Sequence, residues 1–202
     1  MALRDENPIA YLTRGQEVSL DQILRLRAQQ HPERTIYKFL ADGESVSDEI
    51  SYAAFDQRAR AIAAWLQQQG YAGEPVLLVF PEGIDYVAAF FGCLYAGAIA
   101  VPINPPRRNR SSGRLQTVAK DCGARCVLTS GEALDRAAET IQGNPAVANL
   151  KWQPIEAIEL TAAGDWKQVP CEADSPALLQ YTSGSTGTPK GVIVSHGNLV
   201  EN

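Results

Sequence analysis

Apolar positions in the middle of the chain follow two spacings, one typical of helices and one typical of buried strands. Between Phe55 and Leu66, apolar residues recur at helical spacing, which predicts an amphipathic helix that ends near Gly70. Pro75–Phe80 is a continuous apolar run, as expected for a strand that is covered on both faces. The same patterns predict a helix over Ile84–Tyr95, a strand over Ala98–Ile103, a helix around Leu115–Cys122 and a strand over Arg125–Thr129.

This alternation of strands and helices predicts the fold class α/β. A helix that joins two parallel strands crosses over them in a right-handed sense, and repeating the unit gives a mostly parallel sheet flanked by helices on both faces. Ahead of this unit, Ser19 and Gln22 have the spacing of a capping box, which predicts a first helix that ends at His31 before a proline. Residues 34–40 and 46–52 predict two strands of a hairpin, with an Asp-Gly pair in the turn.

The pattern is weaker between residues 131 and 175. Glu132–Ile141 predicts a helix, and Leu150–Leu160 is expected to hold a strand. Thr161–Pro176 combines charges with glycine and proline, which favours a surface connection. The chain is therefore divided into a helix and hairpin over 18–52, a βαβαβ unit over 53–130, a connection over 131–175 and a last pair of strands over 176–196.

A polar, glycine-rich loop separates the two strands of this last pair, Ala177–Tyr181 and Val192–Val194. Glycines let the backbone approach a ligand closely, and successive backbone N–H groups form a concavity that holds anions. The hydroxyls of the loop add donors and Lys190 adds a positive charge, so the pattern indicates a site for the phosphates of a nucleotide. The candidate binding residues are Thr182, Ser183, Gly184, Ser185, Thr186, Gly187, Thr188, Lys190 and Gly191.

This loop differs from the Walker A motif. The Walker lysine follows a glycine directly and leads into a helix, whereas here Lys190 stands three residues after Gly187 and a strand follows. The alternative is a hairpin connection that binds nothing. Five hydroxyls, three glycines and a Pro-Lys-Gly exit favour the phosphate site over that alternative.

Composition narrows the class of protein further. The chain has 202 residues, of which 45% are hydrophobic, and a formal net charge of −5. The arginines between Arg107 and Arg114 form the nearest approach to a basic cluster, but no aromatic residues are interleaved with them, which favours a solvated loop over a nucleic-acid surface. Residues 86–103 are uncharged, but glycine and proline interrupt them and they are barely long enough to span a bilayer, so a buried helix running into a buried strand explains them better. Residues 1–12 lack the apolar core of a signal peptide, and we expect a cytoplasmic protein with no membrane span.

Four cysteines and two histidines are the candidate soft metal ligands of the chain. Cys122 and Cys126 are close in sequence but have no histidine near them, so we predict no metal-ligating residues and expect reduced, buried thiols. His196 is a candidate general base by residue type. Since no carboxylate is placed to orient it, we predict instead that His196 opens a helix after Val194.

Three segments carry a resemblance to a known family. Tyr181–Gly191, with the sequence YTSGSTGTPKG, resembles the phosphate-binding signature of the adenylate-forming superfamily of acyl-CoA synthetases, luciferases and peptide-synthetase adenylation domains. Phe91–Pro102 resembles a helix-to-strand segment shared across these enzymes, and the turn Pro105–Arg110 is similar to that of fatty acyl-AMP ligases. The resemblance extends over about Val18–Asn202, so the chain is identified as the N-terminal portion of such a ligase.

The resemblance implies an ATP-dependent activation of a fatty acid to an acyl-adenylate, with release of pyrophosphate. It implies ATP and Mg²⁺ as cofactors and an acyl carrier protein as the acceptor of the acyl group. The loop would embrace the β- and γ-phosphates through the hydroxyls of Ser183, Ser185 and Thr186. Lys190 would be the catalytic residue that stabilises charge on the leaving pyrophosphate.

Two further expectations follow from this resemblance. Related enzymes hold adenine, ribose, Mg²⁺ and the acyl chain with later segments and carry a mobile C-terminal domain, so the chain alone is expected to be inactive. The same signature also leaves other functions open: an acyl-CoA ligase, an amino-acid adenylation domain, or a non-catalytic nucleotide- or phosphate-binding fragment.

Overall fold

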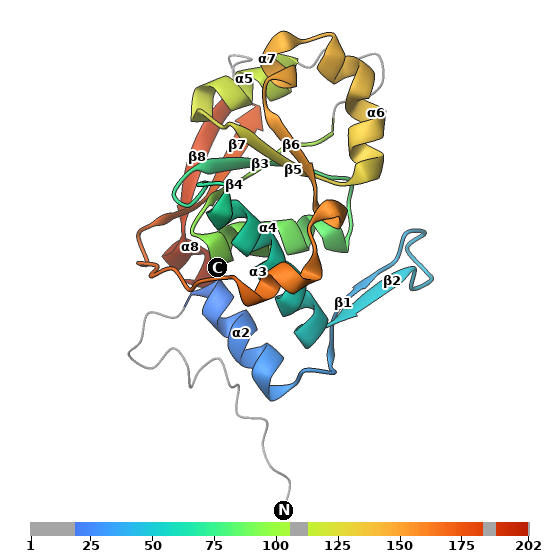
Figure 1. Ribbon diagram of the computed structural model, residues 1–202, viewed down its shortest axis with the longest axis vertical. Coiled ribbons are helices and arrows are strands. Elements are labelled where there is room, and N and C mark those ends of the chain that lie inside the picture. The colour runs from blue at the N-terminus through green and yellow to red at the C-terminus, as the bar shows by residue number, and fades with distance from the viewer. Residues whose placement is uncertain (1–18, 106–112, 184–188, 202) are drawn as a thin grey trace, which may run out of the picture.

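The computed structural model describes residues 19–105, 113–183 and 189–201. Its main sheet has six strands in the order β6-β5-β3-β4-β7-β8 (Figure 1). The first five in this order run parallel, and only the edge strand β8 is antiparallel to its neighbour. The predicted α/β class with a mostly parallel sheet is therefore confirmed. The strands of this sheet are β3 (Pro75–Val79), β4 (Ile99–Pro102), β5 (Cys126–Thr129), β6 (Lys151–Pro154), β7 (Pro176–Ser183) and β8 (Pro189–Ser195).

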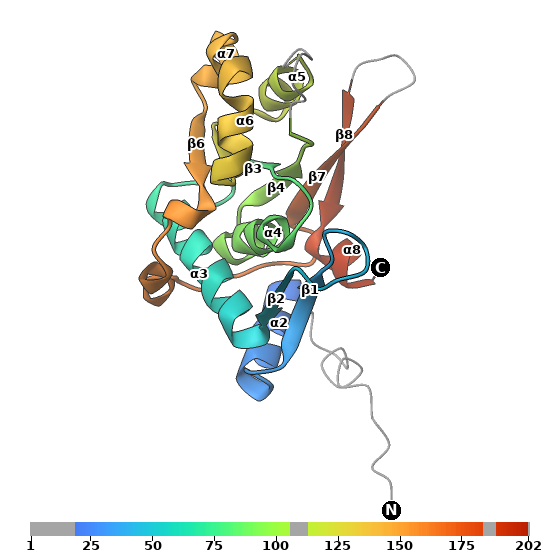
Figure 2. The same ribbon diagram turned by 90° about the vertical axis from the view of Figure 1, so that its right-hand side faces the viewer.

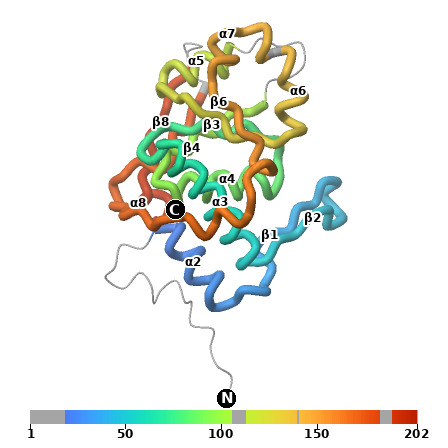
Figure 3. Tube along the Cα trace, in the orientation of Figure 1, coloured from blue at the N-terminus to red at the C-terminus, as the bar shows by residue number. Residues whose placement is uncertain are grey.

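Helices cover both faces of this sheet (Figure 2). Helices α3 and α4 lie on one face, and α5 and α7 lie on the other. The chain path ends in α8, which contacts α2 near the start of the described residues (Figure 3). The helices are α2 (Leu20–Gln30), α3 (Tyr52–Gln68), α4 (Ile84–Ala96), α5 (Gly113–Cys122), α6 (Gly131–Gln142), α7 (Pro145–Ala148) and α8 (His196–Glu201).

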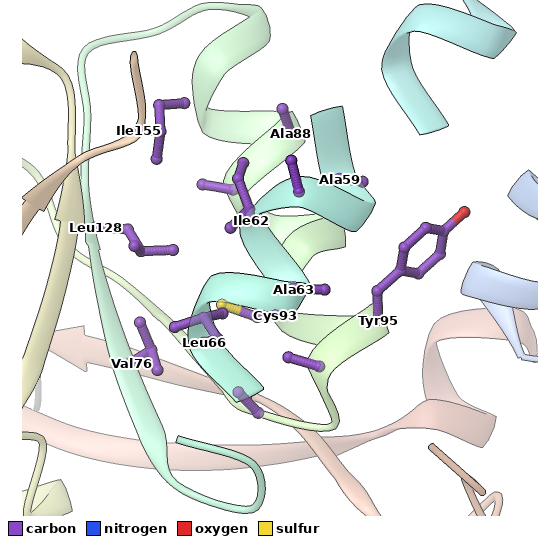
Figure 4. Packing of buried hydrophobic residues seen from close by; sticks show 14 of the residues in the cluster. Ala59, Ile62, Ala63, Leu66, Val76, Ala88, Cys93, Tyr95, Leu128 and Ile155 are labelled. Carbon is purple, nitrogen blue, oxygen red and sulfur yellow. The ribbon is translucent and has the colours of Figure 1, made fainter. Parts of the chain in front are cut away.

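The two faces of the sheet bury two separate apolar clusters because successive side chains of a strand point to opposite sides. In β3, Val76 and Leu78 pack with α3 and α4, while Leu77 and Val79 belong to the cluster on the α5 side. Figure 4 shows the first cluster, in which side chains of α3 and α4 meet those of the strands. The uncharged segment 86–103 is divided between α4 and β4, as predicted.

The N-terminal hairpin forms a separate two-stranded sheet of β1 (Thr35–Phe39) and β2 (Asp48–Ser51). Both strands are shorter than predicted, and β2 ends at Ser51 because this residue is the N-cap of α3: its Oγ accepts a hydrogen bond from the N–H of Ala54 at 3.3 Å. The predicted turn is a longer loop in which the Asp42 carboxylate accepts the N–H groups of two later residues at 2.9 and 2.7 Å.

Part of the region from 131 to 175 belongs to the sheet. The predicted helix is present as α6, and the expected strand is β6, which pairs in parallel with β5. The short helix α7 between them has no counterpart in the sequence prediction. Asn144 caps it by accepting the N–H of Ala146 at 3.1 Å. Two 3-10 helices follow β6, namely η1 (Ile155–Ala157) and η2 (Leu160–Gly164).

The prediction of a surface connection over residues 161–176 is wrong for its first part. Helix η2 packs on α3 and buries Ala163. Trp166 comes next, with its ring centroid 5.3 Å from that of Tyr95, and its Nε1 donates to the Tyr95 carbonyl oxygen at 2.8 Å. Sequence periodicity missed this packing because one tryptophan and a few alanines in an irregular segment have no regular spacing.

A buried polar network joins this segment to three helices. The Asp56 carboxylate in α3 accepts hydrogen bonds from Arg25 at 3.0 Å, Arg60 at 2.8 Å and the hydroxyl of Tyr95 at 2.9 Å. The guanidinium carbon of Arg25 also lies 5.2 Å from the centre of the Trp166 ring. One carboxylate thus connects α2, α3 and α4, with the segment after η2 packed against them.

Across the described residues, none of the helices combines the length and the apolar character that crossing a bilayer requires.

Candidate functional site

The segments that flank the phosphate-type loop are the antiparallel strands β7 and β8 at one edge of the sheet, both longer than predicted. Thr182 pairs with Lys190 in the register, and Tyr181 pairs with Gly191. The predicted residues Gly184, Ser185, Thr186, Gly187 and Thr188 lie outside the described residues.

Thr182 and Lys190 bring a hydroxyl and a cation to the same face of this hairpin, because directly paired residues of two strands share a face. Both residues are exposed. The Lys190 ammonium takes part in none of the ion pairs found within 19–105, 113–183 and 189–201. None of the ion pairs among those residues therefore competes for its charge. Ser183 is the last residue of β7.

A cleft of about 330 Å³ lies beside the hairpin. Its walls come from the carboxyl ends of the parallel strands β3, β4 and β7. From β3 the chain first adds β4 on one side of this strand and then crosses over to add β5 on its other side. The direction in which strands are added therefore reverses next to the cleft. Open α/β sheets bind ligands in crevices at this kind of position. The residues that line it are Leu78, Phe80, Pro81, Glu82, Tyr86, Pro102, Ile103, Asn104, Arg114, Leu178, Gln180 and Tyr181.

None of these lining residues was selected as a site residue from the sequence. Glu82 and Asn104 follow the ends of two neighbouring parallel strands, which is a signal that reading the strand ends together would have detected. Arg114 belongs to α5, and its approach to the cleft follows from packing rather than from any motif. The arginine-rich turn at 106–110 lies outside the described residues.

His196 has the structural position that was predicted for it. It is the first residue of α8, and its backbone N–H donates to the carbonyl oxygen of Ser175 at 3.0 Å. Ser195 and Asn198 cap this helix reciprocally through their side chains and backbone N–H groups, each at 3.2 Å. Burial of the His196 ring lowers its pKa, with a smaller opposing effect from Asp21.

The cysteines offer no activated nucleophile. All four are free; Cys93 and Cys126 are buried, whereas Cys122 and Cys171 are half-buried. Burial raises the pKa of Cys126 to about 12 and that of Cys171 to about 11, so the thiols stay protonated at neutral pH. Within the described part of the chain, no group of acidic, histidine or cysteine side chains is arranged to hold a metal ion.

An open parallel sheet with a cleft at its carboxyl edge is the arrangement in which α/β proteins bind ligands such as nucleotides. A protein-family model described as AMP-binding enzyme matches residues 24–202. The chain belongs to the AMP-binding enzyme family. The adenylate-forming resemblance predicted from the sequence is thus confirmed.

Within this family, the chain is similar to relatives that are named as fatty-acid ligases. The chain is 38% identical over 186 residues to a medium-chain-fatty-acid–[acyl-carrier-protein] ligase of Moorena producens, covering 90% of this chain and 31% of that protein. It is 37% identical over 180 residues to a long-chain-fatty-acid–AMP ligase of Mycolicibacterium smegmatis, covering 87% of this chain and 28% of the relative. The chain therefore spans less than a third of the length of these relatives.

The fold is also similar to a solved structure of a fatty acyl-adenylate ligase. A fatty acyl-adenylate ligase from L. pneumophila, in complex with acyl adenylate and pyrophosphate, superimposes with a TM-score of 0.81 at 37% identity. The match covers 91% of this chain and 31% of the ligase. The described fold is thus similar to the corresponding third of a fatty acyl-adenylate ligase.

Proposed function

We propose that this chain is the N-terminal part of a fatty acyl-AMP ligase. In the proposed reaction a fatty-acid carboxylate attacks the α-phosphorus of ATP, an acyl-phosphate bond forms, and the bond to pyrophosphate breaks. The observation that carries the proposal is the sequence YTSGSTGTPKG on the β7–β8 hairpin. The similarity to relatives named as fatty-acid ligases supports it.

The proposed task of the hairpin is to bind the β- and γ-phosphates and to stabilise the charge that shifts onto pyrophosphate. Lys190 and Thr182 suit this task, because both are exposed on one face and no ion pair among the described residues competes for the lysine charge. We assign hydroxyl donation to Ser183, Ser185 and Thr186, and close backbone approach to Gly184 and Gly187.

Bound Mg²⁺ would supply further charge neutralisation to the triphosphate. The described residues contain no cluster of three or more acidic, histidine or cysteine side chains that could hold a metal ion, and we assign no metal ligand among them. ATP itself fits the residues present, since hydroxyl, cation and glycine-rich backbone are the groups that bind phosphate.

The proposed acceptor of the acyl group is the phosphopantetheine thiol of an acyl carrier protein. The support is the name of the Moorena producens relative, which states that relative's acceptor. A Mycobacterium tuberculosis fatty acyl CoA synthetase and the nonribosomal peptide synthetase FmoA3 are less similar in sequence, at 23% and 24% identity, and these likenesses concern the fold alone.

The test uses the full-length polypeptide that carries residues 1–202, incubated with ATP, Mg²⁺ and a fatty acid. Mass spectrometry would follow the acyl-adenylate. Two further reactions would add an acceptor to this mixture, either holo acyl carrier protein or coenzyme A. A last reaction would replace the fatty acid by amino acids. We expect acyl-adenylate from the fatty acid, and acyl transfer to the carrier protein in preference to coenzyme A.

Three other results would contradict parts of the proposal. Transfer to coenzyme A alone would make the protein an acyl-CoA ligase, and adenylation of amino acids alone would make it an adenylation domain. ATP binding without any adenylate would indicate a non-catalytic nucleotide-binding protein.

A further inference from the structure

The side chain of Tyr181 packs directly against Gly191, its partner in the β7–β8 register. A Cβ atom added to Gly191 would lie 3.0 Å from Cζ and 3.2 Å from the hydroxyl oxygen of Tyr181. Gly191 is not among the described glycines with left-handed backbone, so its conformation gives no reason for a glycine here. A glycine suits this position because a side chain there would crowd the Tyr181 ring.

Helix α5 contacts the same point of the hairpin twice. The Tyr181 hydroxyl donates a hydrogen bond to the Asp121 carboxylate, and Arg114 Nη2 donates to the backbone oxygen of Tyr181 at 3.1 Å. Arg114 and Asp121 are two helical turns apart, so both lie on the side of α5 that faces β7. The helix itself is anchored, because Leu115 and Val118 are buried in the cluster beneath the sheet.

These contacts lie immediately beside the residues proposed to bind phosphate. Thr182 follows Tyr181, and Lys190 precedes Gly191. Since side chains alternate along a strand, the Tyr181–Gly191 pair faces α5 while the Thr182–Lys190 pair faces the other way. A shift of the tyrosine ring would therefore move the backbone that carries Lys190.

We propose that Tyr181, Asp121, Arg114 and Gly191 form a docking contact that fixes the base of the phosphate hairpin on α5. In this contact the absence of a side chain at Gly191 leaves room for the Tyr181 ring. The sequence pattern had instead placed Gly191 among the residues that bind phosphate. The four residues are positioning residues: they act through Thr182 and Lys190. Their effect on ATP rests on the proposed function, whereas the docking itself does not.

The protonation of Tyr181 is consistent with this role. Burial, and then the hydrogen bond to Asp121, raise the pKa of Tyr181. The phenol therefore remains protonated, and a donor to the carboxylate, at neutral pH.

A double-mutant cycle on the full-length polypeptide tests the assignment of the glycine. The variants are Gly191→Ala, Tyr181→Val and the combination of both, with Gly131→Ala as the matched control because nothing lies within 4 Å of a Cβ at that glycine. The readouts are KM for ATP and kcat in adenylate formation, and hydrogen–deuterium exchange of the β8 amides.

We expect Gly191→Ala to lower kcat/KM for ATP about tenfold, as overpacking of this size predicts. In the Tyr181→Val background the same substitution should add less than about twofold, because the ring that it displaces is gone. Equal effects of Gly191→Ala in both backgrounds would overturn the proposal, since the glycine would then serve the phosphate directly.

A second pair of variants tests the hydrogen bond to α5. Tyr181→Phe and Asp121→Ala should each lower kcat/KM for ATP about fivefold and should not add when combined, because each removes the same hydrogen bond. Tyr37→Phe, in the separate β1–β2 sheet, is the matched control. Independent effects of the two substitutions would contradict the docking contact.

Hydrogen exchange separates this inference from the proposed function. If the wild type makes no adenylate, the proposed function fails, but faster exchange of the β8 amides in Tyr181→Phe and Gly191→Ala would still support the docking contact. Unchanged exchange in both variants would overturn it even if the wild type is an active ligase.

Discussion

The Asp56 side chain shows how a single residue connects distant segments of the chain. It is only 5% exposed, and removing a carboxylate from water is unfavourable unless charge and hydrogen bonds compensate. Arg25 and Arg60 supply opposite charge from α2 and α3, and Tyr95 supplies a hydroxyl from α4. The arginines remain partly exposed, which limits their own cost of desolvation.

Removing the Asp56 charge should therefore be costly. Asp56→Asn leaves two arginines facing one another without a counter-charge, and we expect the free energy of unfolding to fall by about 3 kcal/mol. Glu49→Gln is the control, because its ion pair with Lys38 is exposed and should be worth less than about 1 kcal/mol. Urea denaturation of both variants measures the difference, and equal small effects would show that the network contributes little.

At the scale of elements, the packing of α3 on α4 depends on one small residue. A Cβ added to Gly92 would lie 2.5 Å from Cγ2 and 2.8 Å from Cβ of Ile62, so the two helices approach closely at this point. Both helices cover the same face of the sheet, and β3 and β4 are the central strands of that sheet. Their separation therefore affects the strands whose ends form the cleft.

Gly92→Ala should push these helices apart. We expect a loss of about 2 kcal/mol in the free energy of unfolding, since the overlap is with a branched side chain close to the backbone. Gly164→Ala is a suitable control because nothing lies within 4 Å of a Cβ there. Thermal unfolding of the two variants gives the comparison, and a Gly92→Ala variant as stable as the wild type would contradict the close approach.

The elements with regular apolar spacing were predictable from the sequence. Helix α3 buries apolar residues at helical spacing and strand β3 is a continuous buried run, and the sequence displays both patterns directly. Helix η2 and Trp166 could not be located in this way, because their burial depends on α3 and α4 presenting a surface at the right place. Tertiary contacts of irregular segments leave no period in the sequence.

At the scale of the whole molecule, the phosphate hairpin was predictable but its surroundings were not. The signature over Tyr181–Gly191 is local, so the sequence revealed it. The cleft beside it is formed by residues of β3, β4, β7, α4 and α5 and of the segments after β3 and β4, which strand order and helix packing bring together. Strand order depends on which crossover returns beside β4, and no short motif specifies that choice.

The central claim also concerns the whole molecule: the hairpin at the edge of the sheet binds the outer phosphates of ATP during acyl-adenylate formation. The most direct test is fatty-acid-dependent ATP–pyrophosphate exchange by the full-length polypeptide, measured for the wild type, Lys190→Ala and the exposed control Lys38→Ala.

We expect wild-type exchange to require fatty acid, Lys38→Ala to retain it, and Lys190→Ala to lose about a hundredfold in rate, the scale on which removing one charge-stabilising group acts. A Lys190→Ala variant that exchanges pyrophosphate as fast as the wild type, with unchanged dependence on ATP, would contradict the account.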